Sequence, residues 1–164
     1  MKKIFFIFTL FIFLVGCANR GINIYINDQF SSIKNSLVHI VDQRKNKNII
    51  GYIYKNGKIE ADITFSTDLE KYFAKKLENI DKKADIYIKK LSLIYNKSKL
   101  TGENLEGSIL IKVEFEKDGV KKVRIIDLKE SRWIAPINSA KSIEDFTKKL
   151  IDEAVVQVYK ILKS

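Results

Sequence analysis

Alternation of apolar and polar residues with a period of two is the pattern that most constrains this 164-residue chain. In residues 108–115 it places Ile109, Ile111, Val113 and Phe115 on one side of an extended backbone. Comparable runs occupy residues 22–27, 36–44, 48–65, 84–95 and 120–128. This period is typical of strands that bury one face and leave the other in water, so the chain is expected to build a one-sided sheet.

The run at residues 84–95 changes its periodicity in the middle. Ala84, Ile86 and Ile88 share one parity, whereas Leu91, Leu93 and Tyr95 share the other. A shift of one residue turns every following side chain to the opposite face, and one extra residue produces that shift. We therefore predict a β-bulge near Lys89 and Lys90, and the alternative is that both faces of this strand are partly covered.

Two tight turns and two helices complete the pattern. Asn56-Gly57 and Asp118-Gly119 are dipeptides that favour the positive φ angles of two-residue hairpins. Thr67 and Glu70 have the spacing of a capping box, which predicts a helix over residues 66–80. Its apolar stripe consists of Leu69, Tyr72, Phe73, Leu77 and Ile80.

The second helix is expected at the carboxyl end of the chain, beginning at Ser142. A broad apolar stripe marks it, formed by Ile143, Phe146, Leu150, Ile151, Ala154, Val158, Ile161 and Leu162. The resulting order is three strands, a helix, three strands and a helix. We predict an α+β fold, a single domain over residues 24–164 with a mainly antiparallel sheet and two helices packed on one face. Residues 17–23 are expected to be a tether.

The charge is strongly basic, at +10 for the whole chain, but only four of its 30 basic residues are arginine. Recognition of bases and phosphates favours the planar fork of arginine, and aromatic residues do not interleave with basic ones here. We therefore expect no nucleic-acid partner. The joint abundance of Lys, Ile and Asn is typical of an AT-rich genome, and an acidic partner such as lipid headgroups or peptidoglycan is the alternative reason for the charge.

Residues suited to catalysis are scarce. His39 is the only histidine, and its position within a strand predicts a structural role. One Cys and one His are too few for a structural zinc site, and the phosphate-loop and nucleophile-elbow motifs are absent. Asp42 and Arg44 lie two apart on a strand, so we expect them to form a structural ion pair, with a ligand site as the alternative. An enzyme is not expected, nor a metal.

Three residues are candidates for partner binding. Val156 and Tyr159 fall on the polar side of the last helix, three residues apart, where they would form a small exposed patch. Trp133 lies in an irregular segment beside the only proline, and exposed aromatic side chains can anchor partners. The alternative is that Val156 and Tyr159 are scattered surface residues and that Trp133 closes the edge of the sheet.

The amino terminus has the layout of an export signal. Two lysines precede a run from Ile4 to Val15 in which only Thr9 is not apolar, and Gly16 and Cys17 follow. The run is shorter than the roughly 20 apolar residues of a membrane-spanning helix. Leu14-Val15-Gly16-Cys17 resembles the lipobox of bacterial lipoproteins.

That resemblance implies a signal peptide over residues 1–16 and cleavage between Gly16 and Cys17. It also implies a diacylglycerol group and an N-acyl chain on Cys17, which becomes the first residue of the mature protein, and no other cofactor is expected. Several acyl chains anchor a protein stably in a bilayer. Ala18, where Asp would favour retention in the inner membrane, points to the periplasmic face of the outer membrane.

The remaining chain resembles the YajG-type family of small bacterial lipoproteins. The similarity spans most of residues 36–163 and is carried by short motifs, formed by Val41, Asp42, Arg44, Ile50, Gly51, Asp68, Leu69, Ala84, Asp85 and Ile86. The resemblance implies no catalytic residue. We expect a lipid-anchored, non-catalytic component of a cell-envelope complex, such as an outer-membrane, flagellar or transport accessory, that binds a protein partner. The alternative is a module that handles lipid or lipopolysaccharide, with an acyl chain on the uncovered face of the sheet or beneath the last helix.

Overall fold

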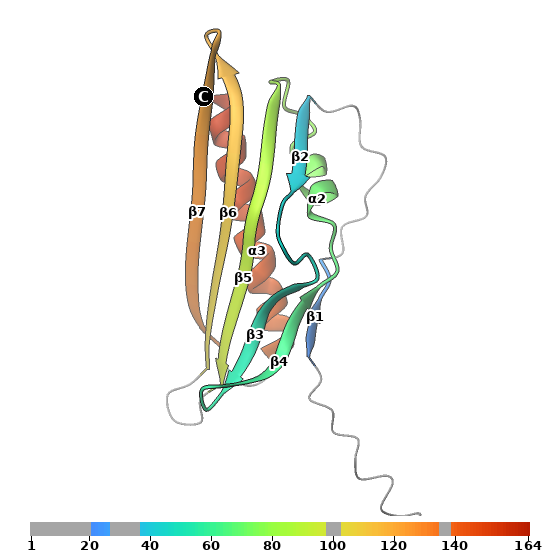
Figure 1. Cartoon of the computed structure of the whole chain (residues 1–164), viewed down its shortest axis with the longest axis vertical. Coiled ribbons are helices and arrows are strands. Elements are labelled where there is room, and N and C mark those ends of the chain that lie inside the picture. The colour runs from blue at the N-terminus through green and yellow to red at the C-terminus, as the bar shows by residue number, and fades with distance from the viewer. Residues whose placement is uncertain (1–20, 27–36, 98–102, 135–138) are drawn as a thin grey trace, which may run out of the picture.

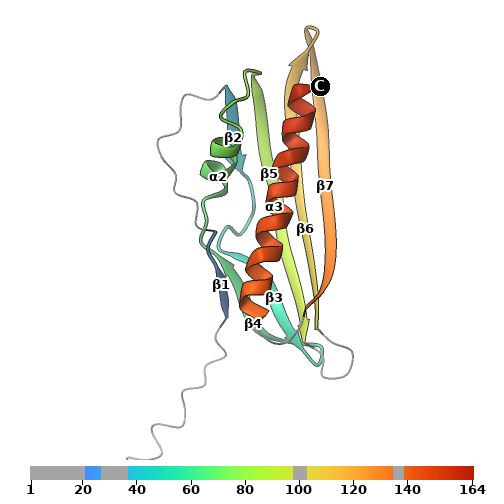
Figure 2. The same ribbon diagram turned by 180° about the vertical axis from the view of Figure 1, so that it is seen from behind.

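A computed structural model describes residues 21–26, 37–97, 103–134 and 139–164, so the expected signal peptide and Cys17 lie outside the described residues. Its elements are β1 (Ile22–Ile24), β2 (Val38–Asp42), β3 (Ile49–Lys55), β4 (Lys58–Phe65), α2 (Leu69–Lys76), β5 (Ala84–Lys97), β6 (Glu103–Lys117), β7 (Val120–Ile134) and α3 (Ser139–Lys163). The strands form one tall sheet, and both helices lie on the same face of it (Figures 1 and 2). The expected α+β class is confirmed.

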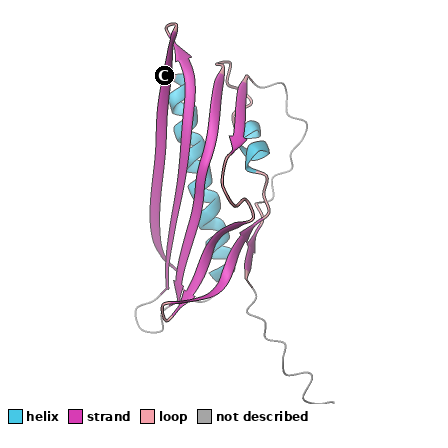
Figure 3. Ribbon diagram, in the orientation of Figure 1, coloured by secondary structure: helices cyan, strands magenta, loops and turns pink. Residues whose placement is uncertain are grey.

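The sheet is mixed: its longest ladders are antiparallel, as expected, but it also contains parallel pairs that were not predicted. Its order is β1-β4-β3-β5-β6-β7, and β2 pairs with β5 beside that path (Figure 3). The pairs β3–β4, β5–β6 and β6–β7 are antiparallel, whereas β1–β4, β2–β5 and β3–β5 are parallel. Parallel strands need a crossover connection. Here the segment containing α2 connects β4 to β5, so that β5 runs parallel to β2 and β3.

Strand β1 extends the sheet into the expected tether. Ile22 is in register with Ile63 of β4, and the amide of Ser66 donates to the carbonyl of Ile24 at 3.0 Å. The described sheet therefore begins at Ile22, two residues before the domain boundary predicted at residue 24. Backbone pairing explains the difference, because the first strand has its hydrogen-bond partners in β4.

The hydrophobic core lies between the sheet and the helices. Ile109, Ile111 and Val113 of β6 are fully buried, as the alternation predicted. Both helical stripes are confirmed as core, with Ile161 half-buried. The Tyr72 hydroxyl of α2 donates to Asp152 Oδ1 of α3 at 2.5 Å, which ties the helices together.

The space beneath α3 is tightly filled where it crosses β6. A Cβ atom on Gly107 would lie 2.5 Å from Phe146 and 3.0 Å from both Leu150 and Leu93. Interiors are packed to crystal-like density, so only a residue without a side chain fits at this point. The backbone of β6 consequently packs against the side chains of Phe146 and Leu150 on the helix.

Both helices begin at residues other than the predicted caps. Asp68, not Thr67, caps α2 by accepting from the amide of Lys71 at 3.1 Å. The Thr67 hydroxyl instead accepts from the amide of Ile26 at 2.8 Å. Helix α3 begins at Ser139, three residues before the predicted start. Tertiary contacts as well as sequence spacing decide which side chain caps a helix. The sequence pattern alone does not reveal those contacts.

The predicted hairpin turns and the predicted bulge are confirmed. Asn56 and Gly57 have φ angles of 52° and 74°, and Asp118 and Gly119 have 55° and 72°. In the β5–β6 ladder, Ile88 pairs with Ile111 and Lys90 pairs with Leu110, so Lys89 is the extra residue. Lys89 and Lys90 are consecutive and both exposed.

Gly51 sets how closely β3 approaches β5, and we predict that Gly51→Ala destabilises the fold by about 2 kcal/mol or more. A Cβ atom there would lie 2.1 Å from the carbonyl oxygen of Leu93, and backbone cannot move aside as a flexible side chain can. Gly57→Ala is the control, because nothing lies within 4 Å and only its φ of +74° costs about 1 kcal/mol. Urea unfolding of the purified protein measures both, and equal losses would contradict this packing.

Candidate functional site

A gap in the sheet lies beside β5, at the bulge. The β2 ladder ends where Asp42 pairs with Ile88, and the β3 ladder begins where Gly51 pairs with Leu93. The two short strands therefore lie end to end along one edge of β5, and residues 89–92 have no strand partner on that edge. A groove of about 710 Å³ lies at this gap, and we call it the strand-gap groove.

Apolar side chains line part of the strand-gap groove on the uncovered face of the sheet. Tyr52 of β3 and Ile94 of β5 are register partners, and they are 39% and 40% exposed. Tyr54 lies edge-on to Tyr52, with ring centroids 6.5 Å apart and an interplanar angle of 74°. Leu110 of β6, which is paired with Lys90, also lines the groove. Large apolar side chains that gather on a surface are a common mark of an interaction site.

Lysines surround these apolar side chains. Lys45 from the β2–β3 loop, Lys89 and Lys90 line the strand-gap groove, and none of the residues lining it is acidic. Among the described residues, no carboxylate oxygen lies within 4.0 Å of these three ammonium groups. Lys89 Nζ instead contacts the side-chain oxygen of Gln43 and lies 5.4 Å from the centre of the Tyr87 ring.

Three lysines elsewhere on the same face have carboxylate partners. Glu114 of β6 lies between Lys112 and Lys121, at 2.5 and 2.7 Å. Hydrogen bonds lower the pKa of Glu114 to about 2, and the one from Lys112 has a larger effect than the one from Lys121. Lys129 lies 3.0 Å from Asp127. In the strand-gap groove, by contrast, Lys45, Lys89 and Lys90 lie together without such a neighbour among the described residues.

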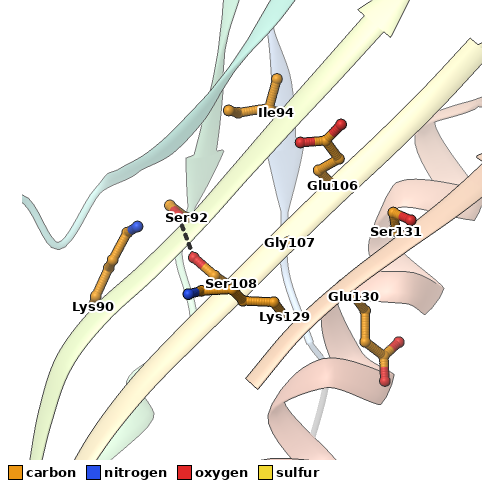
Figure 4. A pocket seen from close by; sticks show the side chains of 9 residues that line it. All are labelled: Lys90, Ser92, Ile94, Glu106, Gly107, Ser108, Lys129, Glu130 and Ser131. Atoms are coloured by element: carbon orange, nitrogen blue, oxygen red, sulfur yellow. Dashed lines mark hydrogen bonds between the residues drawn. The ribbon is translucent and has the colours of Figure 1, made fainter. Parts of the chain in front are cut away.

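A second hollow of about 410 Å³ adjoins the strand-gap groove across β5 (Figure 4). Lys90, Ser92 and Ile94 line both. The Ser92 and Ser108 hydroxyls share a hydrogen bond of 2.8 Å between β5 and β6. The depression therefore continues from β3 toward β7, with polar side chains on the β6 and β7 side.

Asp42 and Arg44 form the expected ion pair, at the end of β2. Arg44 Nε lies 2.9 Å from Asp42 Oδ1 and Nη2 lies 2.7 Å from Oδ2, with both side chains about 95% buried. The guanidinium carbon lies 5.7 Å from the centre of the Phe65 ring. Arg44 Nη1 is buried without a hydrogen-bond partner among the described residues. The backbone amide of Asp42 donates to Glu70 Oε1 of α2 at 2.8 Å, and this hydrogen bond joins the end of β2 to the helix.

His39 lies on the uncovered face and not in the core. Its Nδ1 is 3.2 Å from Asp85 Oδ1 on the paired strand, and its side chain is 71% exposed. In the part of the chain that the structure describes, no three residues among His, Cys, Asp and Glu are grouped so as to hold a metal ion.

The three residues predicted for partner binding are exposed but do not form one site. Trp133, at the end of β7 on the uncovered face, is 62% exposed. Val156 and Tyr159 lie on the outward side of α3 and are 48% and 41% exposed. Lys163 Nζ lies 5.8 Å from the centre of the Tyr159 ring. The strand-gap groove was not predicted, and the only sequence signal near it was the change of periodicity at Lys89.

The comparisons with known proteins do not assign a family. No protein-family model matches the chain, and no curated protein matches it. One similar solved structure is an uncharacterised protein, with a TM-score of 0.39, 8% identity and coverage of 85% of this chain and 99% of that one. Another is a minor lipoprotein from Acinetobacter baumannii, with a TM-score of 0.35, 15% identity and coverage of 75% and 92%. None of the described helices has the length and apolar character needed to span a membrane.

The buried ion pair leads to a stability prediction. Arg44→Met leaves the Asp42 carboxylate buried without its partner, which should cost about 3–5 kcal/mol in the free energy of unfolding. The double variant Asp42→Leu with Arg44→Met removes both charges and should recover most of that loss. Urea unfolding followed by circular dichroism measures both, and a single variant within 1 kcal/mol of the parent protein would contradict a structural role.

The patch on α3 leads to a second prediction. Tyr159→Glu should leave the free energy of unfolding within about 0.5 kcal/mol, because the ring is already partly in water. The substitution should also lower the affinity for a partner that docks on this side of the helix. The control is Phe146→Ala, which empties a core position and should cost about 3–5 kcal/mol. A comparable loss for Tyr159→Glu would identify Tyr159 as a core residue.

Proposed function

We propose that this chain is a lipid-anchored protein of the bacterial cell envelope whose folded domain binds a protein partner and catalyses no reaction. The observation that carries the proposal is the uncovered face of the sheet, where exposed apolar side chains and unneutralised lysines meet at the strand-gap groove. The lipobox-like Leu14-Val15-Gly16-Cys17 supports the anchor. The proposed site of anchoring is the outer membrane, on the periplasmic side.

The spacing of the anchor and the sheet supports a role close to the bilayer. Five residue steps separate Cys17 from Ile22, the first residue of β1. An extended chain covers at most about 3.6 Å per residue, so this tether reaches about 18 Å. A domain held so close to the bilayer encounters envelope partners at a high effective concentration. This geometry suits an accessory component of an envelope complex.

Lipid or lipopolysaccharide handling is the second candidate function. It requires a place for an acyl chain, and the tight contact of Gly107 with Phe146 and Leu150 disfavours the space beneath α3. The strand-gap groove is the observation that favours this candidate, because apolar side chains and lysines also suit an anionic lipid. The open shape of the groove disfavours lipid handling, since small-molecule sites usually enclose most of the ligand surface.

The anchor is tested by Cys17→Ser. A serine hydroxyl does not replace the thiol that would carry the acyl group, so the protein should move from the membrane pellet to the soluble fraction. Ala18→Ser is the matched control and should stay in the pellet. Full retention of the Cys17→Ser protein in the pellet at high salt would contradict lipid anchoring.

Partner binding is tested by reversible chemical crosslinking in intact cells, followed by identification of the co-purified proteins. One envelope protein should co-purify with the parent chain and should be lost with Cys17→Ser, because the domain is then displaced from the membrane. If no protein is enriched over a mock purification, the proposal of a protein partner fails.

A further inference from the structure

The strand-gap groove offers unpaired backbone as well as side chains. Residues 89–92 of β5 lie between the ladders of β2 and β3, so their groups that point to that edge have no strand to pair with. At about 3.3 Å per residue, this stretch matches an extended segment of four to five residues. Added strands of this kind gain affinity from main-chain hydrogen bonds and specificity from alternate side chains.

The charge of the groove selects the chemistry of such a segment. Lys45, Lys89 and Lys90 carry positive charge with no carboxylate neighbour among the described residues, and Arg44 is already neutralised by Asp42. An acidic segment complements this potential, whereas a second copy of this basic chain does not. The apolar pair Tyr52 and Ile94 requires at least one apolar side chain on the same face of the segment.

We propose that the strand-gap groove binds an extended acidic segment of the partner protein, which fills the gap along β5. Carboxylates of the segment meet Lys45 and Lys90, and an apolar side chain packs on Tyr52 and Ile94. This inference rests on the proposed function and names the site and the partner's chemistry. A protein segment suits an open groove better than an acyl chain does, because the rest of the partner covers the flank that a lipid would leave in water.

The test is photocrosslinking of the full-length, lipidated protein in the bacterium that makes it. The photoreactive residue p-benzoylphenylalanine replaces Tyr52 or Ile94 in the groove. Four exposed positions outside it serve for comparison: Ile59, Ile125, Trp133 and Tyr159. Each adduct is identified by mass spectrometry, and the partner peptide that carries the crosslink is mapped.

Charge variants then decide the role of the lysines. Lys45→Glu with Lys90→Glu should lower the yield from positions 52 and 94 by about tenfold. Lys45→Arg with Lys90→Arg should retain it. Lys58→Glu with Lys122→Glu is the matched control, because it changes the net charge equally at exposed sites outside the groove. This control should leave the yield within about twofold.

Crosslinks from positions 52 and 94 to one acidic peptide, lost only in the groove charge variant, would support the inference. An adduct with the mass of a lipid, a mapped peptide without acidic residues, or a yield insensitive to Lys45 and Lys90 would overturn it. Protein crosslinks from positions 133 or 159 alone would overturn the inference while leaving the proposed function intact. Crosslinks from none of the six positions would overturn both.

Discussion

Strand β5 is the element on which the rest of the fold depends, because it pairs with three other strands. It holds β6 along one edge, and β2 and β3 in succession along the other. Lys89 interrupts this strand as a bulge, and it does so where one neighbour has ended and the next has not begun. The apolar side chains of both halves of β5 can then face the core, from Ala84, Ile86 and Ile88 before Lys89 and from Leu91, Leu93 and Tyr95 after it, and two consecutive lysines remain in water.

The two faces of the sheet differ: one is covered by the helices (Figure 2), and the other carries the strand-gap groove. The helix-covered face is closed by α3, whose Phe146 and Leu150 side chains pack directly on the backbone of β6 at Gly107. At the end of β2, the Asp42 side chain is paired with Arg44, and the Asp42 backbone amide donates to Glu70 of α2. These contacts lie behind the strand-gap groove, which is lined mainly by residues of β3 and β5, with Lys45 from the β2–β3 loop at its side. Binding at a preformed site loses less conformational entropy than binding that must order a loop.

Local patterns in the sequence were sufficient for the elements and insufficient for their arrangement. The parity change between Ile88 and Leu91 predicted the bulge, and Asn56-Gly57 predicted its hairpin, because both effects act within a few residues. The parallel pairs were missed, since they depend on which distant strand the chain meets after α2. The groove was missed for the same reason: β2 and β3 lie end to end only in the folded sheet. Lys45 and Lys90 therefore looked like part of a general lysine bias.

The central claim is that β5 has an unpaired edge at its bulge that a partner segment can fill. Amide hydrogen exchange along β5, measured residue by residue by NMR, tests it most directly. Amides in residues 89–92 that point toward the gap should exchange at least tenfold faster than those of Ile86 and Ile94, which lie within the ladders. Uniform protection from Ala84 to Lys97 would show that the edge is already paired, and that result would contradict the claim.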